Sequence, residues 1–426
     1  MSLGPTNYQV IIVGAGFAGV AAAKRLGKNK ISTLLIDRDN YQQFQPLLYQ
    51  VATAQLPASD VAEPLRSTFR RHPSVHVMTA EVTAVDSGER TVTLADGSVH
   101  QGQIVVVAAG AAVNFFGTPG AAEYTHPLYS IHDATRLAAD LIAELDDLDA
   151  RANDGADPEP LNIVIVGGGP TGVETAGAIA EAISTVVPHY FSSEVQKHCA
   201  VHLVDRGPTV LGPFSAKSQT YARERLEALG VHLHLGIGVK EVAADSVTLS
   251  DDSTLPTRIV VWAGGLQAEP VVGTAGAATG RGGRIDVDAD LTVPGVDGLY
   301  ALGDAANIPD GHDGTLPQLG SVALQSGHWA AANIMADLAG EPRRAFEYTD
   351  RGFMAMIGRM AAVAEIGPDR KQIQGPAAFA GWLAVHAALL PSMRSRFDAV
   401  RNWSRDYLTD SRSETVLEAV EQPPTS

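Results

Sequence analysis

The stretch VIIVGAGFAGVAAAKRL, residues Val10–Leu26, is an apolar run followed by a glycine-spaced turn and a segment of helix-forming residues. A near copy of its opening, IVIVGGGPTGVETAGAIAE, lies at Ile163–Glu181. Each copy predicts a β-strand, a tight turn and an α-helix in that order. The second copy alone carries a glutamate, Glu174, within the predicted helix. We therefore expect one supersecondary unit to occur twice in this chain.

The repetition extends beyond the glycine turns. A second apolar strand follows each turn, STLLID ending at Asp37 and AVHLVD ending at Asp205. The segments 75–110 and 231–265 also align, and each predicts an entering strand, short alternating strands around a turn, and a returning apolar strand. The sequence therefore predicts an α/β chain with two Rossmann-like dinucleotide-binding domains.

The spacing of the glycines indicates what these turns bind. In each G-x-G-x-x-G turn the first glycine permits the tight turn, the second lets a pyrophosphate approach the backbone, and the third lets helix and strand pack closely. The phosphates then lie at a helix N-terminus, where free N–H groups favour an anion. The acidic residue at the end of the next strand accepts hydrogen bonds from a ribose hydroxyl. The residues concerned are Gly14, Gly16, Gly19 and Asp37 in the first copy, and Gly167, Gly169, Gly172 and Asp205 in the second.

Two such turns predict two dinucleotides, a flavin (FAD) and a nicotinamide (NADH). The alternative is that the glycines serve only close helix–sheet packing. The segment LYALGDAA, residues 299–306, resembles the flavin-contacting segment of flavoproteins with two dinucleotide sites. Gly303 and Asp304 would then close the flavin site that begins at Gly14, although Asp304 could instead cap a following helix. Further cofactor-binding residues expected from the sequence are Arg38, Gln45, Gly110 and Gly264.

Composition bounds the remaining possibilities. The chain has 426 residues, 45% apolar and 19% charged, as in a globular protein with more than one core. The net charge of −17 argues against nucleic acid as a partner. A single cysteine, Cys199, excludes a disulfide framework, a CxxC redox pair and a cysteine-ligated metal cluster, and we expect no metal site. Val10–Ala23 is uncharged but too short and glycine-rich to span a membrane.

Longer stretches resemble the type II NADH:quinone oxidoreductases. They are IDRDNYQQFQPLLYQVATAQLPASDVAEPLRSTFR (36–70), VVAAGAAVNFFGTPG (106–120), GGGPTGVETAGAIAE (167–181) and FAGWLAVHAALLPSMRSRFDAVRNWSRDYL (379–408). The resemblance implies hydride transfer from NADH to FAD and electron transfer to a quinone without proton pumping. It also implies a cytoplasmic protein on the inner face of the cell membrane, possible homodimers, and a FAD domain split by an inserted NADH domain. The expected bounds are 1–115 and 286–340 for the FAD domain, 116–285 for the NADH domain, and 341–426 for a small C-terminal domain for membrane association or dimerisation.

The resemblance also implies roles for three residues. Glu174 matches the glutamate that the family places near nicotinamide, flavin and quinone, where a carboxylate can relay protons or orient the nicotinamide carboxamide. The alternative is a first-turn glutamate stabilised by the helix dipole. The family carries two glutamines four residues apart in its quinone helix. Here Gln325 is kept but Ser321 replaces the first glutamine. Gln325 could also be an ordinary polar residue on a helix face.

The C-terminal stretch predicts two helices with apolar and basic residues. Trp382, Leu383, His386, Leu389 and Leu390 share one helical face. After Pro391, an arginine side (Arg394, Arg401, Arg405) is expected opposite an apolar side (Phe397, Val400, Trp403, Tyr407). Aromatic residues and arginines on a helix favour a membrane-surface anchor. The alternative is a helix pair packed on the protein body or at a dimer interface.

Three functions therefore compete. The first is NADH:quinone oxidoreductase, the second a soluble NAD(P)H-dependent flavoprotein reductase with another acceptor such as a small redox protein, and the third a nucleotide-binding flavoprotein without turnover. Ser321 favours the second, and the FQPLLYQVAT block with the C-terminal helices favours the first. The quinone, the oligomeric state and the reaction with oxygen stay open, as does NADPH use, because Arg206 follows Asp205 directly.

Overall fold

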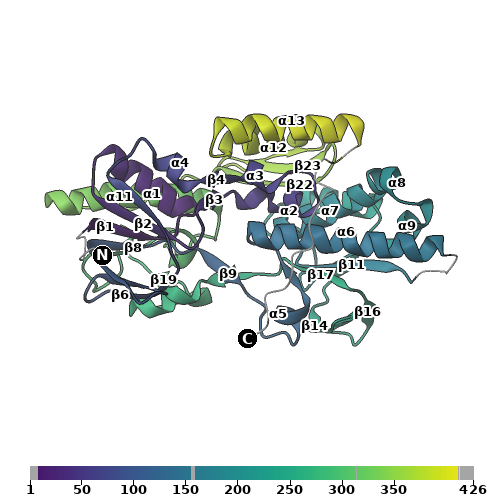
Figure 1. The fold of residues 1–426 in the computed structure, drawn as a ribbon, viewed down its shortest axis with the longest axis horizontal. Coiled ribbons are helices and arrows are strands. Elements are labelled where there is room, and N and C mark those ends of the chain that lie inside the picture. The colour runs from purple at the N-terminus through teal and green to yellow at the C-terminus, as the bar shows by residue number, and fades with distance from the viewer. Residues whose placement is uncertain (1–7, 155–158, 313, 411, 413–426) are drawn as a thin grey trace. The chain divides into compact units, whose positions relative to one another are not determined.

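The computed structural model describes residues 8–154, 159–312, 314–410 and 412 (Figure 1). The chain forms two compact units, each made from three separate pieces of sequence. Unit 1 comprises residues 1–43, 63–113 and 266–350, and unit 2 comprises residues 44–62, 114–265 and 351–426. Residues 155–158 and the end of the expected C-terminal domain (413–426) lie outside the described residues. The division into three domains, one of them split into two segments, stays a prediction.

Unit 1 is built on a seven-stranded sheet whose path is β5-β2-β1-β8-β7-β6, with β20 paired to β8. Strand β1 is parallel to both β2 and β8, and the apolar run of the first glycine motif forms its centre. The strands are β1 (Tyr8–Val13), β2 (Thr33–Asp37), β5 (Val75–Thr79), β6 (Val82–Asp86), β7 (Thr91–Leu94), β8 (Val99–Val107) and β20 (Leu299–Ala301). The predicted strand–turn–helix order is confirmed, since helix α1 (Phe17–Lys28) follows β1.

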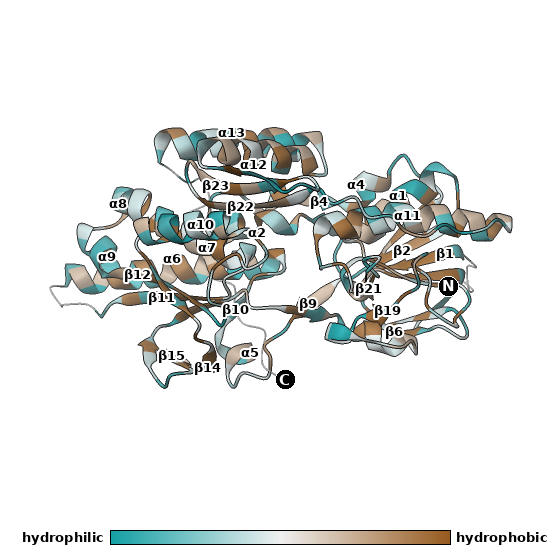
Figure 2. Ribbon diagram, turned by 180° about the vertical axis from the view of Figure 1, so that it is seen from behind, coloured by the Kyte–Doolittle hydropathy of each residue, from teal (hydrophilic) through white to brown (hydrophobic). Residues whose placement is uncertain are grey.

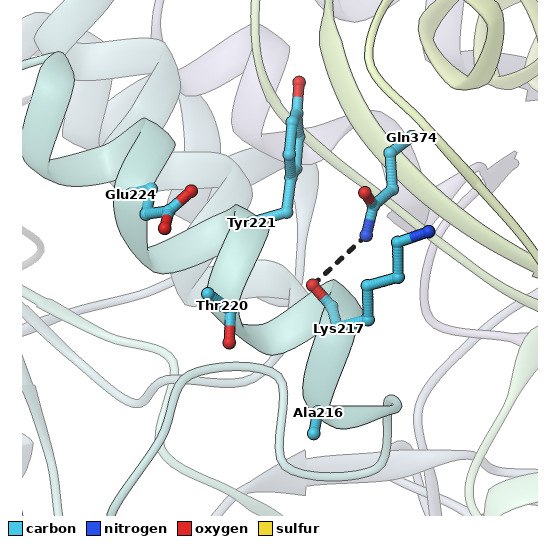
Figure 3. Close-up of a pocket in the computed structure, with 6 residues that line it drawn as sticks. All are labelled: Ala216, Lys217, Thr220, Tyr221, Glu224 and Gln374. Carbon is cyan, nitrogen blue, oxygen red and sulfur yellow. Dashed lines mark hydrogen bonds between the residues drawn. The ribbon is translucent and has the colours of Figure 1, made fainter.

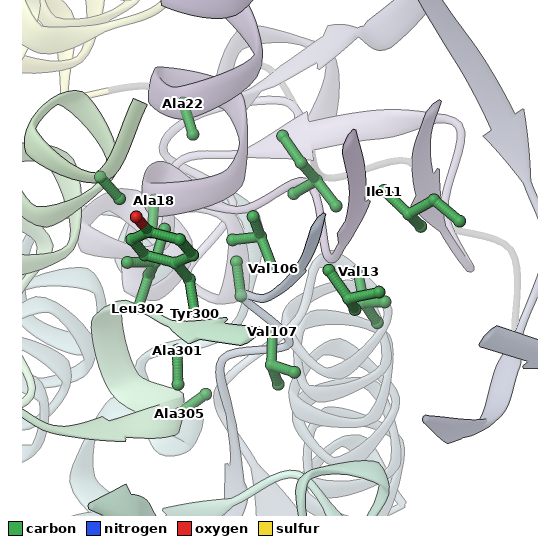
Figure 4. Close-up of a cluster of buried hydrophobic side chains, with 14 of the residues drawn as sticks. Ile11, Val13, Ala18, Ala22, Val106, Val107, Tyr300, Ala301, Leu302 and Ala305 are labelled. Carbon is green, nitrogen blue, oxygen red and sulfur yellow. The ribbon is translucent and has the colours of Figure 1, made fainter. Parts of the chain in front are cut away.

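Helix α1 packs against α11 (Gly320–Ala339), and small residues let the two helices approach. A Cβ atom at Gly327 would lie only 2.1 Å from the carbonyl oxygen of Ala18. Under these helices the apolar side chains of β1, β8 and β20 form one core, part of which is drawn in Figure 4. Tyr300 is fully buried there and donates a 2.7 Å hydrogen bond to Asp337. This core holds strand β1 in place, and the first glycine turn follows at the carboxyl end of that strand.

Unit 2 repeats this plan with a five-stranded parallel sheet in the order β10-β17-β11-β12-β13. The strands are β10 (His126–Pro127), β11 (Leu161–Val166), β12 (Cys199–Asp205), β13 (Val231–Leu235) and β17 (Ile259–Trp262). Helix α7 (Pro170–Thr185) follows β11, and helix α6 (Ile131–Asn153) precedes β11 in the chain. One part of the plan differs between the units. In unit 1 the antiparallel strands β6 and β7 belong to the main sheet. The corresponding strands of unit 2 form a separate antiparallel sheet of β14 (Val239–Val242), β15 (Ser246–Leu249) and β16 (Thr254–Pro256).

The residues after 350 join unit 2 as an antiparallel sheet, β22-β23-β24, with two helices. Strand β22 crosses α7 at Gly177, where a Cβ atom would lie 1.8 Å from the carbonyl oxygen of Ile357. Only glycine permits this approach, which brings the backbone of β22 onto the helix that carries Glu174. The elements are β22 (Gly352–Gly358), β23 (Ala361–Ile366), β24 (Lys371–Gln374), α12 (Pro376–Leu389) and α13 (Met393–Thr409).

Helices α12 and α13 run side by side, and both predicted helices are confirmed (Figures 1 and 2). The expected separation of faces on α13 is wrong. Phe397 and Val400 are exposed on the same side as the arginines, whereas Trp403 is buried. The buried face of α13 contains both polar and apolar residues. Its apolar residues are therefore distributed over the buried face and the exposed face. The residues of the buried face are Ser395, Ala399, Asn402, Trp403 and Asp406.

Shorter elements connect these parts. In unit 1 they are β3 (Tyr41–Gln43), α4 (Leu65–Phe69), β9 (Ala111–Val113), β18 (Leu266–Ala268), η2 (Pro270–Ala275), η3 (Arg281–Gly283), β19 (Ile285–Asp286), η4 (Gly303–Ala305) and β21 (Ala306–Asn307). In unit 2 they are η1 (Gln45–Leu47), α2 (Leu48–Ala52), α3 (Ala58–Val61), α5 (Ala121–Tyr124), α8 (Val187–Tyr190), α9 (Ser193–His198) and α10 (Ala216–Ala228). Strand β4 is Ala62–Pro64.

Candidate functional site

The first glycine turn has the geometry of a phosphate cradle. Gly14 has a φ of +100°, and a Cβ atom there would lie 2.3 Å from the carbonyl oxygen of Ala108. At Gly19 a Cβ atom would lie 1.9 Å from the oxygen of Gly14, so this glycine permits helix and turn to pack. Gly16, the N-cap of α1, has no atom within 4 Å of its Cβ position. Packing explains the first and third glycines but not the second, whose open side suits an anion at the helix N-terminus.

The second turn repeats this geometry residue by residue. Gly167 has a φ of +117° and would place a Cβ atom 2.6 Å from the oxygen of Ala263. Gly172 would place one 1.8 Å from the oxygen of Gly167, whereas Gly169 again faces open space. The packing alternative therefore leaves Gly16 and Gly169 unexplained. Both turns fit the pyrophosphate of a dinucleotide.

The two aspartates at the strand ends, Asp37 and Asp205, both accept hydrogen bonds from backbone N–H groups. Asp37 accepts hydrogen bonds from the backbone N–H groups of Ala15 and Asp39, and Asp205 accepts 2.6 Å hydrogen bonds from those of Gly168 and Gly207. Burial raises the pKa of Asp37, against the lowering effect of these hydrogen bonds. Each carboxylate is fixed beside its glycine turn, where the ribose of a dinucleotide lies in this fold.

Arg206 lies beside Asp205 and bears on the choice between NADH and NADPH. Its guanidinium carbon is 5.8 Å from the centre of the Phe116 ring, a cation–π contact. The Arg206 side chain also fills the space next to Gly238, where a Cβ atom would lie 2.8 Å from its Nε. These contacts direct the guanidinium along Phe116, and Asp205 is the acidic group fixed next to the turn.

The other residues predicted to contact FAD in unit 1 occupy different environments. Gly303, with a φ of +59°, donates its N–H to Ser326, and Asp304 lies in the 3-10 turn that it begins. The alternative in which Asp304 caps a following helix is wrong, because residues 306–307 form strand β21. Gly110 has a φ of +78° after β8. Arg38 is exposed and forms a 2.8 Å ion pair with Glu269.

Two further predicted residues belong to unit 2. The side-chain oxygen of Gln45 is buried and has no hydrogen-bond partner among the described residues, which suits an acceptor for a ligand. Gly264 lies two residues after Trp262, and a Cβ atom there would lie 3.4 Å from the indole nitrogen. That nitrogen donates a 2.9 Å hydrogen bond to the carbonyl oxygen of Asn114. The backbone at Gly264 is thus set by a fixed indole.

Glu174 is the most unusual of the predicted residues. It is buried in α7, and its Oε1 accepts 3.1 Å hydrogen bonds from the backbone N–H of Met356 and from Nε1 of Trp382. Burial raises its pKa to about 8, although both hydrogen bonds favour the charged form. The helix-dipole alternative predicts a first-turn glutamate with a lowered pKa, whereas Glu174 lies beyond the first turn of α7 and its pKa is raised. A carboxyl group with this pKa gains and loses a proton near neutral pH.

Aromatic residues surround Glu174 and join the two most specific segments of the resemblance. The Trp382 ring stacks on His386 at 3.8 Å, and Tyr49 of the FQPLLYQVAT block meets Trp382 edge-on. Gln50 of the same block donates to Tyr49 and accepts a 2.7 Å hydrogen bond from the Trp403 indole. Sequence reasoning missed these hydrogen-bond partners, because it placed both tryptophans on apolar helix faces and an apolar pattern does not show where an indole N–H donates.

Ser321 and Gln325, on α11 of unit 1, make local contacts. The Ser321 hydroxyl is 2.9 Å from that of Tyr348. The amide of Gln325 donates to the carbonyl of Thr349 and accepts from its N–H, both at 3.0 Å. The segment at 348–349 was not predicted to belong to this site. One N–H of Gln325 remains to donate, since an amide nitrogen carries two.

A separate surface hollow lies between α10 and β24 in unit 2 (Figure 3). It has a volume of about 410 Å³, and Gln374 crosses it to donate a 3.1 Å hydrogen bond to the backbone oxygen of Lys217. None of the residues predicted from the sequence lines it. The hollow therefore belongs to neither dinucleotide turn.

Comparisons with known proteins agree with this geometry. The family model described as pyridine nucleotide-disulphide oxidoreductase matches residues 8–327. The chain is 33% identical to the type II NADH:quinone oxidoreductase Ndh of Mycobacterium tuberculosis, over 97% of this chain and 91% of the relative. It is 29% identical to the internal alternative NAD(P)H-ubiquinone oxidoreductase A1 of Arabidopsis thaliana mitochondria, over 94% of this chain and 84% of that protein.

Solved structures share the fold. The structure of NDH2 from Plasmodium falciparum in complex with NADH matches with a TM-score of 0.87 at 18% identity, covering 95% of this chain and 99% of that one. The sulfide:quinone oxidoreductase of Aquifex aeolicus matches with a TM-score of 0.74 at 17% identity, over 94% and 95% of the two chains. Identity and coverage in the curated relatives, with a dinucleotide fold in each unit, establish that this chain belongs to the type II NADH:quinone oxidoreductases.

Proposed function

We propose that this protein oxidises NADH and reduces a quinone, with FAD as the bound carrier and Glu174 as the group that handles protons. The observation that carries the proposal is the buried Glu174 carboxyl group, held by Met356 and Trp382 and poised to titrate near neutral pH. Reduction of a quinone consumes two protons, so a positioned carboxyl group with such a pKa supplies what the reaction needs.

The two glycine turns divide the cofactor binding between them. We assign FAD to the turn of unit 1, with Asp37 and Asp304, and NADH to the turn of unit 2, with Asp205. When bound, FAD supplies the redox chemistry by accepting the hydride of NADH and passing on two electrons. The protein contributes binding and orientation: open glycines at helix N-termini for the phosphates and fixed carboxylates for the riboses.

Gln325 and Ser321 are assigned to quinone recognition. The free N–H of Gln325 is suited to donate to a quinone carbonyl, while Thr349 fixes the orientation of the amide. Ser321 is shorter than the glutamine of the family pattern, and its hydroxyl is shared with Tyr348. We therefore expect the headgroup preference of this protein to depend on the Ser321–Tyr348 pair.

The exposed side of α12 and α13 is assigned to a membrane surface, on the inner face of the cell membrane. Figure 2 shows α12 largely apolar and α13 with apolar and polar residues interspersed. The exposed apolar side chains there are Val385, Leu389, Met393, Phe397, Val400 and Leu408. Arg394, Arg401 and Arg405 lie exposed beside them, as expected of a helix at a lipid interface. Within the described residues, no helix has the length and apolar character needed to cross a membrane.

One experiment separates the competing functions. The holoenzyme is mixed with NADH and a short-chain quinone, and NADH oxidation is compared with that under oxygen alone. We expect rapid turnover that requires the quinone. Turnover with a small redox protein but not with quinone would support the soluble reductase, and absence of turnover with every acceptor would support a non-enzymatic flavoprotein.

A further inference from the structure

Two carboxylates of α7 line one small cavity inside unit 2. Glu174 and Glu181 are seven residues apart, which is close to two helical turns, so they lie on the same face about 10 Å apart along the axis. The space open to a water centre in the cavity is about 10 Å³, roughly what one water molecule needs. The other lining residues are Tyr49, Gln55, Ala178, Met356, Gly358, Tyr407 and Arg412.

The inner end of this cavity is at Glu174. Both of its hydrogen bonds end on Oε1, so Oε2 is the oxygen left to exchange a proton. The hydroxyls of Tyr49 and Tyr407 both lie against the sulfur of Met356, at 3.4 and 3.8 Å. The wall around Glu174 is thus aromatic and weakly polar, which keeps bulk water away from the carboxyl group.

Glu181 lies at the other end of this cavity, next to a partly exposed ion pair. Its Oε2 accepts a 2.7 Å hydrogen bond from the backbone N–H of Arg359, whose guanidinium forms a 2.6 Å ion pair with Asp410. The side chains of Arg359 and Asp410 are 29% and 41% exposed, whereas Glu181 is buried. Glu181 therefore lies between the solvent-exposed ion pair and the closed cavity.

Glu181 shares its nearest cations with other carboxylates. Arg359 forms a 2.6 Å ion pair with Asp410 and also lies 3.6 Å from Glu181, and Arg412 lies 3.5 Å from Asp406. Like charges held close together disfavour each other's ionisation. Burial raises the pKa of Glu181 even though Arg412 lowers it. The titratable and charged groups around the two glutamates on neighbouring elements are Tyr49, Arg359, Asp406, Tyr407, Asp410 and Arg412. His386 stacks on Trp382, which donates to Glu174.

Unsatisfied polar atoms also point to water in this cluster. Nε of Arg412 and Oδ1 of Asp406 are buried without a hydrogen-bond partner among the described residues. Arg412 lines the cavity, and such atoms are normally satisfied by ordered water. The cavity thus has the size and the polar groups to hold a bridging water.

We propose that Glu181 and a cavity water relay protons from solvent at the Arg359–Asp410 pair to Glu174. This inference rests on the proposed role of Glu174 as proton donor to the quinone. The reaction takes one hydride from NADH and one proton from solvent, giving NAD⁺ and the quinol. In the relay, Glu174 gives its proton to a quinone oxygen and takes one from the water. The water is replenished by Glu181, and Glu181 by solvent.

The test follows the exchange of the Glu174 proton by infrared spectroscopy of the FAD-loaded enzyme. The carbonyl band of protonated Glu174 is assigned by its loss in Glu174→Gln, and its shift is timed after transfer to D₂O. We expect Glu181→Gln to slow this exchange by at least about tenfold, because Gln keeps the acceptor for Arg359 but cannot pass a proton. Glu181→Asp should recover most of the rate. Glu224→Gln, an exposed carboxylate on α10, should exchange as the wild type does.

A second variant leaves every charge in place. A Cβ atom at Gly358 would lie 3.4 Å from Oε2 of Glu181 and 3.1 Å from Leu229, so Gly358→Ala narrows the water site at a small packing cost. It should slow exchange as Glu181→Gln does. Wild-type exchange rates in both variants would overturn the relay. Failure of quinone turnover in the wild type would overturn the proposed function instead, and the exchange measurement would still report proton access to Glu174.

Discussion

The indole Nε1 of Trp382 donates a 3.1 Å hydrogen bond to Oε1 of Glu174, across 208 residues of sequence. The bond ties the C-terminal helix α12 to the helix of the second glycine turn. It stabilises the ionised carboxylate, as does the N–H of Met356. Burial outweighs both, so the carboxyl group titrates near neutral pH instead of near its usual value.

Protein stability should therefore depend on pH through Glu174. Its pKa is about 8 when folded and 4.5 when unfolded, so the folded state binds the proton more tightly. The resulting stability is complete below the unfolded pKa and is lost as pH rises through about 8, by roughly 1.4 kcal/mol for each pKa unit. Urea unfolding of Glu174→Gln from about pH 5 to about pH 9 should show a weaker fall than the wild type. Parallel curves would contradict the burial of a titrating carboxyl group.

The two open glycines should distinguish the cofactor sites. A methyl group at Gly16 or Gly169 meets no protein atom, so each variant should fold, but the methyl obstructs the pyrophosphate. Gly16→Ala should lower the FAD content of the purified protein. Gly169→Ala should keep FAD and raise the KM for NADH by about tenfold or more. Gly212→Ala, also facing open space, is the control. Loss of FAD in Gly169→Ala together with a raised KM for NADH in Gly16→Ala would mean that FAD binds at the second turn and NADH at the first.

NADH should be preferred over NADPH. Asp205 is fixed by two backbone N–H groups, so its charge repels a 2′-phosphate, and Arg206 is engaged with Phe116. Asp205→Asn keeps a hydrogen-bond acceptor but removes the charge. It should therefore lower the ratio of the flavin reduction rate with NADH to that with NADPH, measured by stopped flow. Asp251→Asn, an exposed change in the same unit, should not. Equal rates with NADH and NADPH in the wild type would refute this account of specificity.

The surface of α12 and α13 should determine binding to liposomes. A truncation after Gly375 would not test this surface alone, because it removes Trp382 from Glu174 and Trp403 from Gln50. The double change Leu389→Ser with Phe397→Ser alters only exposed residues. Each lost apolar contact weakens transfer by about 1–3 kcal/mol, so sedimentation with anionic vesicles should fall at least about tenfold while FAD stays bound.

The control is Val99→Ser, an exposed apolar residue of unit 1. It should leave vesicle binding unchanged. If the double variant sediments like the wild type but elutes as a smaller particle in gel filtration, a second copy of the chain covers this surface instead of lipid.

The glycine turns could be predicted because their geometry is local: Gly14 and Gly167 need positive φ, and the aspartates lie at fixed positions one strand later. The environment of Glu174 could not, since its partners come from β22 and α12, far along the chain. The spacing of apolar residues around Trp382 predicts an apolar helix face, and Trp382 is indeed buried. The spacing does not predict which acceptor the indole N–H meets. Likewise, the backbone contacts of Gln325 at Thr349 depend on tertiary packing alone.

The central claim is that Glu174 supplies a proton to the quinone, and stopped-flow kinetics of Glu174→Gln test it most directly. Flavin reduction by NADH and flavin reoxidation by a short-chain quinone are recorded separately from about pH 5 to about pH 9. We predict that reduction is close to wild type, since the glycine turn is unchanged. Reoxidation should slow about 100-fold, in the range for loss of a general acid, and lose its dependence on pH near 8. Reoxidation at the wild-type rate across this range would contradict the account.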